Sequence, residues 1–208
     1  DRGQSNAINK GLRISTGDIV AYLNSDDTYK TGVVPRVVEV FRQNPNIDLV
    51  YGDCDIIDEN EQKIGVFQGV PTSFRKMLCT GRACIPQQTA FWRKSVIENI
   101  GYFDESFHFA MDTDFFIRIL KRYESLYVPV NYANHRWHRN SKSSIEKGSC
   151  ANKFREDRIK ILRKHGLQYL GYYYARYLFM SKIKRLIFGE KPLLRIKRGY
   201  IRFFKESL

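Results

Sequence analysis

Long hydrophobic runs are missing from this chain: no uncharged apolar stretch reaches the roughly 18 residues that a membrane-spanning helix needs. Cysteine is scarce, with 4 residues and no Cys-x-x-Cys spacing, so we expect free, mostly buried thiols rather than a disulfide framework. No signal peptide is visible, because the chain opens with charged and polar residues. These absences favour a cytoplasmic protein.

Acidic residues are scarce in one part of the chain only. Residues 1–150 carry 19 Lys and Arg against 18 Asp and Glu, whereas residues 151–208 carry 16 against 4, so the last part contributes +12 of the formal net charge of +13. A hydrophobic content of 43% over 208 residues excludes a wholly disordered chain and allows one buried core plus an appendage. We therefore expect a nearly neutral domain over residues 1–148 and a basic, aromatic-rich helical extension over residues 149–208.

Apolar spacing predicts an α/β or α+β domain with a mixed sheet, ending near residue 145. Strands are expected at 19–23, 47–51, 89–92 and 127–130, a hairpin over 56–67, and helices around 5–14, 33–41, 93–101 and 114–120. The first strand has the composition of a central strand, yet a helix comes before it in the chain. In a β-α-β unit, the parallel neighbour of this strand would come before that helix. We therefore expect that the N-terminal part of a larger domain is missing.

One apolar run ends in two acids. The strand at 19–23 is followed by Asn24, Ser25, Asp26 and Asp27. Ligands in open α/β sheets collect beyond the carboxyl ends of such strands, and two adjacent carboxylates need a compensating group. A divalent cation with oxygen ligands would supply it. The alternative is that both aspartates begin the next helix, where Asp is a favoured N-cap.

A second acidic pair, Asp112 and Asp114, comes just before the apolar residues of a helix. Aspartate suits the first turn of a helix, so both residues can serve that helix alone. In the functional interpretation, one carboxylate is a general base that faces a cleft, and the other orients it or binds a substrate hydroxyl.

Two polar segments also allow more than one interpretation. His138 could ligate a metal or be an ordinary loop histidine, and the basic residues around it in 135–143 could neutralise phosphate. Gln87 and Gln88 could bond sugar hydroxyls or complete the hydrogen bonds of their own loop.

Five segments occur in an order and spacing that is specific although each motif is loose. They are DRGQ with Ala7, Asn9 and Gly11; TGDIVAYLNSDD at 16–27; IPQQTAFWR at 85–93; GYFDE at 101–105; and MDTDF at 111–115. Together they resemble the family 2 glycosyltransferases over about residues 1–145. The resemblance implies a GT-A-like (Rossmann-like) mixed sheet flanked by helices, N-terminally truncated here and continued by the basic extension.

The resemblance implies that a sugar moves, with inversion, from a nucleoside diphosphate donor (UDP- or dTDP-linked) to a hydroxyl of a saccharide or lipid-linked acceptor in cell envelope polysaccharide or glycoconjugate synthesis. Asn24, Ser25 and Asp26 occupy the family's Asp-x-Asp position, which binds the donor ribose and a Mn²⁺ or Mg²⁺ ion. The implied metal ligands are Asp26, Asp27 and His138; the implied donor contacts are Arg2, Gln4, Asn9, Asn24 and Asp26; the implied acceptor contacts are Gln87 and Gln88.

Asp112 matches the position of the family's base, and Asp114 is the next candidate. Met111 stands where the family commonly has Glu, and this difference leaves the choice between the two aspartates open. This mechanism requires Asp26 and Asp112 to line opposite walls of one cavity. A non-catalytic remnant that only packs against partners is the competing hypothesis.

The extension begins with an expected helix that ends near His165, and beyond it basic residues alternate with aromatic and aliphatic ones. This pattern describes a helix on an anionic membrane surface, here the inner face of the plasma membrane. The extension could instead pack on the body or on a second subunit, or bind nucleic acid. The nearly neutral body argues against nucleic acid.

Overall fold

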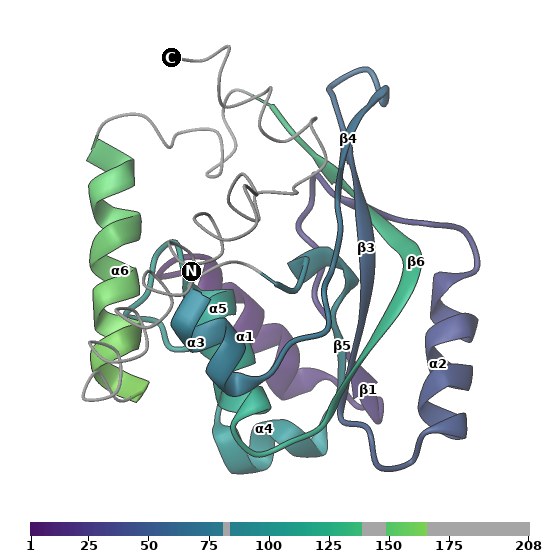
Figure 1. Cartoon of the computed structure of the whole chain (residues 1–208), viewed down its shortest axis with the longest axis horizontal. Coiled ribbons are helices and arrows are strands. Elements are labelled where there is room, and N and C mark those ends of the chain that lie inside the picture. Colours follow the sequence, from purple (N-terminus) through teal and green to yellow (C-terminus); the bar gives the residue numbers. More distant parts are fainter. Residues whose placement is uncertain (81–83, 139–148, 166–208) are drawn as a thin grey trace, which may run out of the picture.

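A computed structural model describes residues 1–80, 84–138 and 149–165 of the chain. Within these residues, six strands form one mixed sheet in the order β1-β5-β3-β6-β2, with β4 paired to β3 off this path (Figure 1). The strands are β1 (Ile19–Val20), β2 (Thr28–Tyr29), β3 (Leu49–Ile57), β4 (Lys63–Phe67), β5 (Phe91–Arg93) and β6 (Ser125–Arg136). The predicted α/β class with a mixed sheet is confirmed.

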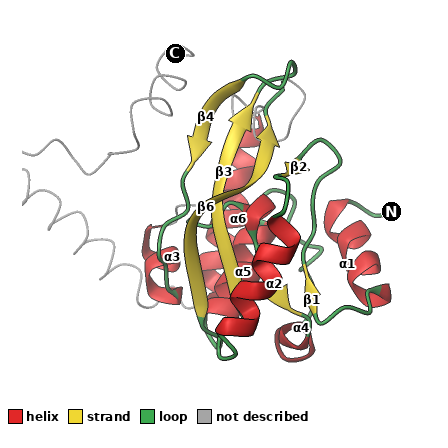
Figure 2. Cartoon of the chain, turned by 90° about the vertical axis from the view of Figure 1, so that its right-hand side faces the viewer, coloured by secondary structure: helices red, strands yellow, loops and turns green. Residues whose placement is uncertain are grey.

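Helices lie on both faces of this sheet. They are α1 (Gln4–Ile14), α2 (Val33–Gln43), α3 (Phe74–Thr80), the 3₁₀ turn η1 (Gln87–Thr89), α4 (Ser95–Ile100), α5 (Met111–Leu120) and α6 (Ser149–His165). Helix α2 stands on one face, in front of the sheet in Figure 2, whereas α3, α4, α5 and α6 lie on the other. In the described part of the chain, no helix is long and apolar enough to cross a membrane.

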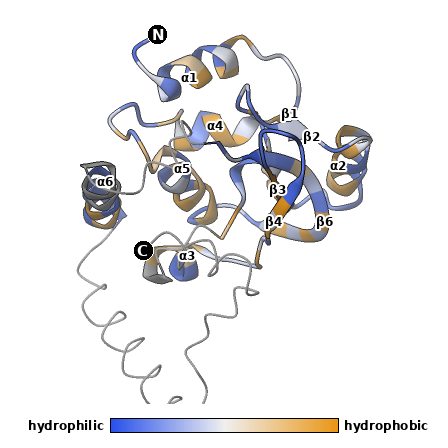
Figure 3. Ribbon diagram, turned by 90° about the horizontal axis from the view of Figure 1, so that it is seen from above, coloured by the Kyte–Doolittle hydropathy of each residue, from blue (hydrophilic) through white to orange (hydrophobic). Residues whose placement is uncertain are grey.

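Both faces of the sheet are packed, which explains why its central strand reads as an apolar run rather than an alternation. Leu49 and Tyr51 of β3 belong to the larger apolar cluster, and Val50 between them belongs to the cluster under α2. Figure 3 shows the apolar side of α2 facing the strands. Cys54 and Cys84 are free and buried, as the sequence predicts.

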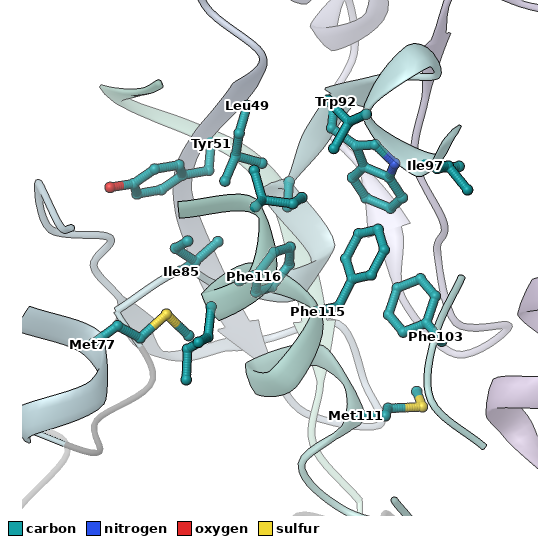
Figure 4. Packing of buried hydrophobic residues seen from close by; sticks show 14 of the residues in the cluster. Leu49, Tyr51, Met77, Ile85, Trp92, Ile97, Phe103, Met111, Phe115 and Phe116 are labelled. Carbon is teal, nitrogen blue, oxygen red and sulfur yellow. The ribbon is translucent and has the colours of Figure 1, made fainter. Parts of the chain in front are cut away.

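Aromatic rings organise the larger cluster. Phe103 and Phe115 stack with their centroids 4.1 Å apart, and Trp92 meets Phe115 edge-on at 5.1 Å (Figure 4). Phe115 is fully buried on α5. The rings therefore join β5, the loop before α5 and α5 itself, and they fix where α5 begins relative to the sheet.

Three strands differ from the sequence prediction. The first strand is shorter than predicted: β1 pairs antiparallel with β5 through Ile19 and Val20 only and stands at one end of the described sheet. Its central place stays a prediction, because it depends on the segment expected to precede the chain. Strand β3 continues past Gly52, although the strand predicted at 47–51 ends just before this residue. Strand β6 continues six residues past its predicted end at Val130, because it pairs in parallel along the length of β3. The segment proposed to precede the chain stays a prediction.

Gly52 explains how two long strands stay paired where their register shifts. A Cβ atom at this position would lie 2.4 Å from the carbonyl oxygen of Val130 and 2.8 Å from the ring of Tyr132. The register between β3 and β6 shifts at this point, between Tyr51 and Asp53. The close approach of backbone to backbone therefore requires glycine.

We expect Gly52→Ala to lower the free energy of unfolding by at least about 2 kcal/mol, because a fixed carbonyl oxygen cannot yield to the new methyl group. Gly65→Ala in β4 is the matched control, since its Cβ would meet Ile56 at an ordinary 3.6 Å, and we expect it to change stability by less than about 0.5 kcal/mol. Urea denaturation of both variants measures this. Equal effects would contradict the assigned close approach.

Candidate functional site

The two adjacent aspartates after β1 have different environments. The side chain of Asp27 has no exposed surface. Its Oδ1 lies 3.1 Å from Nδ1 of His135 and accepts the amide of Arg136 at 2.9 Å, and its Oδ2 accepts the side-chain amides of Asn24 and Gln88 at 3.0 Å. Because α2 starts only at Val33, neither aspartate caps it, and the capping alternative is excluded.

The electrostatics of Asp27 follow from these contacts. Burial alone would raise the pKa of its carboxyl, but the bonds from His135, from the amide of Arg136 and from Gln88 outweigh burial and hold the pKa below its ordinary value. The charge of Asp27 is therefore compensated by hydrogen bonds, and both of its carboxylate oxygens are bonded inside the protein. A metal-ligand role for Asp27 stays a prediction.

Asp26 is the accessible member of the pair. Its Oδ2 lies 3.1 Å from Nε2 of His138, and the two side chains are 36% and 27% exposed. Both line a hollow of about 1190 Å³ that runs between one side of α1 and the segment from Ile19 to Asp26. Asp112 is not among the residues that line this hollow. The hollow is therefore not the cavity between Asp26 and Asp112 that the sequence hypothesis requires.

An amide network fixes the loop that carries Asp26. Gln4 donates its side-chain amide to Oδ1 of Asn24 at 2.8 Å, and Gln87 donates to the carbonyl oxygen of Tyr22 at 2.8 Å. Gln87 and Gln88 are only 8% and 7% exposed. The interpretation that these glutamines complete the bonds of the loop is thus the one that the contacts support, while an acceptor role for them stays a prediction.

The two other expected donor contacts lie elsewhere. Arg2 is exposed before α1, and its backbone amide donates to Oδ1 of Asn6. Asn9 is buried and exchanges two bonds of 2.9 Å with the backbone of Phe103, while its amide also donates to Glu105. Asn9 therefore ties α1 to the loop before α5 and has no amide hydrogen left for a ligand.

Asp112 lies in the first turn of α5 and is half-buried. Burial raises the pKa of its carboxyl, and the bonds from the amide and hydroxyl of Thr113 oppose this rise only in part. Burial also raises the pKa of the Tyr22 phenol, and the carboxylates of Asp112 and Asp27 both add to that rise. The ring of Tyr22 packs against that of Phe103, 5.3 Å away, so the segment that carries Asp26 contacts the loop before α5.

Asp114 is engaged as fully as Asp27. It has no exposed surface, and its oxygens lie 2.9 Å from Nε of Arg118, 2.9 Å from Nε2 of His165 and 3.0 Å from Nζ of Lys164. Burial alone would raise the pKa of Asp114, but these three partners hold it below the ordinary value. The contacts separate the two candidate bases: Asp114 is held by a cationic cluster, and Asp112 is the less constrained carboxylate.

No group of three or more His, Cys, Asp or Glu side chains suited to a metal ion occurs within residues 1–80, 84–138 and 149–165. The donor set nearest to one is Asp26 with His138. The sequence interpretation gave His135 no role in the site, because the strand was expected to stop at Val130, whereas β6 continues to Arg136.

We expect Asp114→Asn to destabilise the protein by about 3 kcal/mol at neutral pH, because it leaves buried cations without their carboxylate. The folded-state pKa of Asp114 is below the unfolded one, so its contribution is complete above about pH 5 and disappears as the pH falls through the folded-state pKa. The measurement is the free energy of unfolding of both proteins from about pH 7 to pH 2. Glu39→Gln, which removes a surface partner of Arg42, is the control. A difference that does not shrink at low pH would contradict the role of the Asp114 charge.

The comparisons with known proteins agree with one another. Residues 1–101 match the family model described as Glycosyl transferase family 2. An uncharacterized glycosyltransferase of Nostoc sp. is 34% identical over 107 residues, which is 48% of this chain and 33% of that protein. The PGL/p-HBAD biosynthesis glycosyltransferase of Mycobacterium tuberculosis is 29% identical over 119 residues, which is 57% of this chain and 44% of that protein. The chain thus spans a third to less than half of the length of these relatives.

Among solved structures, S. aureus TarS 1–349 in complex with UDP-GlcNAc is similar with a TM-score of 0.54 and 17% identity, over 78% of this chain and 46% of that one. At this identity the likeness concerns the fold. It confirms the GT-A-like arrangement of a mixed sheet flanked by helices.

Proposed function

Because the chain belongs to glycosyl transferase family 2 through residues 1–101, we propose that it transfers a sugar from a nucleoside diphosphate donor to an acceptor hydroxyl, with inversion at the anomeric carbon. The donor class that we propose is a UDP-linked sugar, which TarS binds in its solved complex. The observation that carries the proposal is the pair Asp26 and His138, 3.1 Å apart at the border of the hollow. The ring of Tyr22, on the same segment as Asp26, packs 5.3 Å from the ring of Phe103 in the loop before α5.

On the donor side, we assign the diphosphate to Asp26 and His138. Their side chains are 3.1 Å apart, partly exposed, and border the same hollow. Mg²⁺ and Mn²⁺ are commonly held by one or two protein ligands together with substrate phosphates, so two side chains fit such an ion. When bound, the ion stabilises the charge that develops on the leaving diphosphate. Asn24, next to this pair, donates its amide hydrogens to Asp27 and Gln87, so it would bond a ribose hydroxyl by accepting at Oδ1, beside the bond from Gln4.

On the acceptor side, we assign the role of base to Asp112. Because burial raises its pKa, it takes a proton more readily than an ordinary aspartate. The acceptor oxygen gives its proton to Asp112 and forms a bond to the anomeric carbon. The bond from that carbon to the diphosphate oxygen breaks on the opposite face, and its electron pair leaves with the diphosphate. Atoms and charge therefore balance without a covalent enzyme intermediate.

The first test separates the base from the donor ligands. We expect Asp112→Asn to lower kcat for release of UDP from UDP-GlcNAc by about 10²- to 10⁴-fold with little change in KM, because only the transition state uses the base. Glu59→Gln, on the exposed turn between β3 and β4, is the matched carboxylate-to-amide control. Full activity of Asp112→Asn would show that Asp112 is not the base.

The second test concerns the ion. We expect Asp26→Ala to weaken Mn²⁺ affinity by at least about tenfold, because one of two protein ligands is lost. Mn²⁺ titration followed by electron paramagnetic resonance, with and without UDP, measures this directly. Unchanged Mn²⁺ affinity in Asp26→Ala would exclude Asp26 as a ligand and would leave the donor side unassigned.

The acceptor that we propose is a saccharide or lipid-linked hydroxyl, as in cell envelope polysaccharide synthesis. Contact with an anionic membrane was predicted from the basic extension, most of which lies at 166–208, outside the described residues. The described part of that extension, α6, packs on the body through Ile161 and Leu162.

A further inference from the structure

Helix α6 contacts the chain on both sides of Asp112. It follows the residues matched by the family model, and two of its side chains reach buried positions next to α5. Asp157, near its middle, is 4% exposed, and the side chain of His165, at its end, is 6% exposed. Figure 1 shows α6 standing on the same side of the sheet as α5.

The first contact is made before α5. One oxygen of Asp157 lies within hydrogen-bonding distance of three successive backbone amides: His108 at 2.9 Å, Phe109 at 2.8 Å and Ala110 at 3.4 Å. Ala110 is the residue at which α5 begins. A carboxylate in this position holds the chain direction that leads into the helix and also complements the positive end of its dipole.

The second contact is made inside the first turn. His165 and Lys164 approach the same oxygen of Asp114 at 2.9 and 3.0 Å, and Lys164 also bonds Asp104 at 2.7 Å. This cation holds the pKa of Asp104 down at about 2, against the effect of burial. Helix α6 thus bonds the backbone of residues 108–110 through Asp157 and the side chain of Asp114 through Lys164 and His165. Asp112 lies between these two places in the chain.

A purely packing role does not explain these charges. Burying a carboxylate costs desolvation, and apolar residues of similar size usually stabilise a helix contact as well or better. Ile161 and Leu162 already provide an apolar contact on the same helix. What a buried Asp157 adds is a fixed geometry of three amides, and catalytic groups lose efficiency steeply when they are displaced by about 1 Å.

We propose that α6 is a positioning element of the candidate active site, and that Asp157 holds the turn from which Asp112 acts on the acceptor hydroxyl. The proposal rests on the function proposed above. It predicts that the catalytic arrangement is complete only when the chain continues through α6, beyond the part matched by the family model.

The test compares Asp157→Ala with Glu156→Ala, its exposed neighbour on the same helix. We expect Asp157→Ala to lower kcat for UDP release from UDP-GlcNAc by about 10- to 100-fold, with KM for the donor unchanged within about twofold. In the Asp112→Asn background the same substitution should cause no further loss, because both changes act through one group. Glu156→Ala should behave like the unchanged protein.

A general loss of stability is the competing explanation, and Val37→Ala controls for it, since Val37 is a buried residue of α2, on the other face of the sheet. If Val37→Ala lowers Tm as much and kcat as much as Asp157→Ala, the positioning role is wrong. An equal loss on Asp157→Ala in the Asp112→Asn background would overturn it too. Where the alanine variant does not fold, Asp157→Asn keeps one acceptor oxygen and should show a smaller loss in the same direction.

Hydrogen exchange supplies a readout that needs no activity. In Asp157→Ala, the amides of 108–113 should exchange faster while those of α1 and α2 stay unchanged. If Asp112→Asn proves fully active, the proposed function fails but this exchange result still decides whether Asp157 holds the turn. Unchanged exchange at 108–113 would overturn the proposal.

Discussion

The buried carboxylate of Asp27 is the constraint on which the candidate site depends. Its two oxygens gather donors from three parts of the chain: Asn24 in the same loop, Gln88 in η1, and His135 with Arg136 at the end of β6. A charge without exposed surface is tolerable only when it is bonded in this way. The loop after β1 therefore has one arrangement, and in that arrangement Asp26 faces His138 at the border of the hollow.

The two aspartates at the start of α5, Asp112 and Asp114, also have different environments. Asp114 is buried among Arg118, Lys164 and His165, which leaves Asp112 as the carboxylate with a raised pKa. In each acidic pair, one member is engaged in buried contacts, and the other is the one to which we assign a role in the proposed reaction. The ring of Tyr22 packs on Phe103, and Asn9 bonds the backbone of the same residue, so direct contacts connect the segment after β1 and α1 to the loop before α5.

The sequence predicted those features that depend on neighbours along the chain. The apolar runs gave most helices and the β3–β4 hairpin, and the abrupt change from Leu23 to Asn24 marked the functional loop. It could not divide the roles within Asp26 and Asp27, because the partners of Asp27 lie 61 and 108 residues away. Nor could it predict how short β1 is, since the length of a strand depends on its pairing partners, here Trp92 and Arg93 of β5.

Long-range contacts also explain why Gln87 and Gln88 were hard to interpret. Their side chains suit sugar recognition, but the folded chain uses them to hold Tyr22 and Asp27. Likewise, the sequence predicted a helix that ends near His165. Nothing local in the sequence indicated that Asp157, Lys164 and His165 of this helix would contact α5 and the turn before it. Polar residues with ordinary local roles and those with positioning roles look alike until the fold brings their partners together.

The central claim is that Asp26, and not its buried neighbour, presents the donor side of the site. The most direct measurement is the paramagnetic broadening of ¹H–¹⁵N signals by Mn²⁺ in the presence of UDP. The account predicts strong broadening at residues 24–27 and at His138, and its loss in Asp26→Ala. Broadening centred elsewhere on the molecule, or kept in Asp26→Ala, would contradict it.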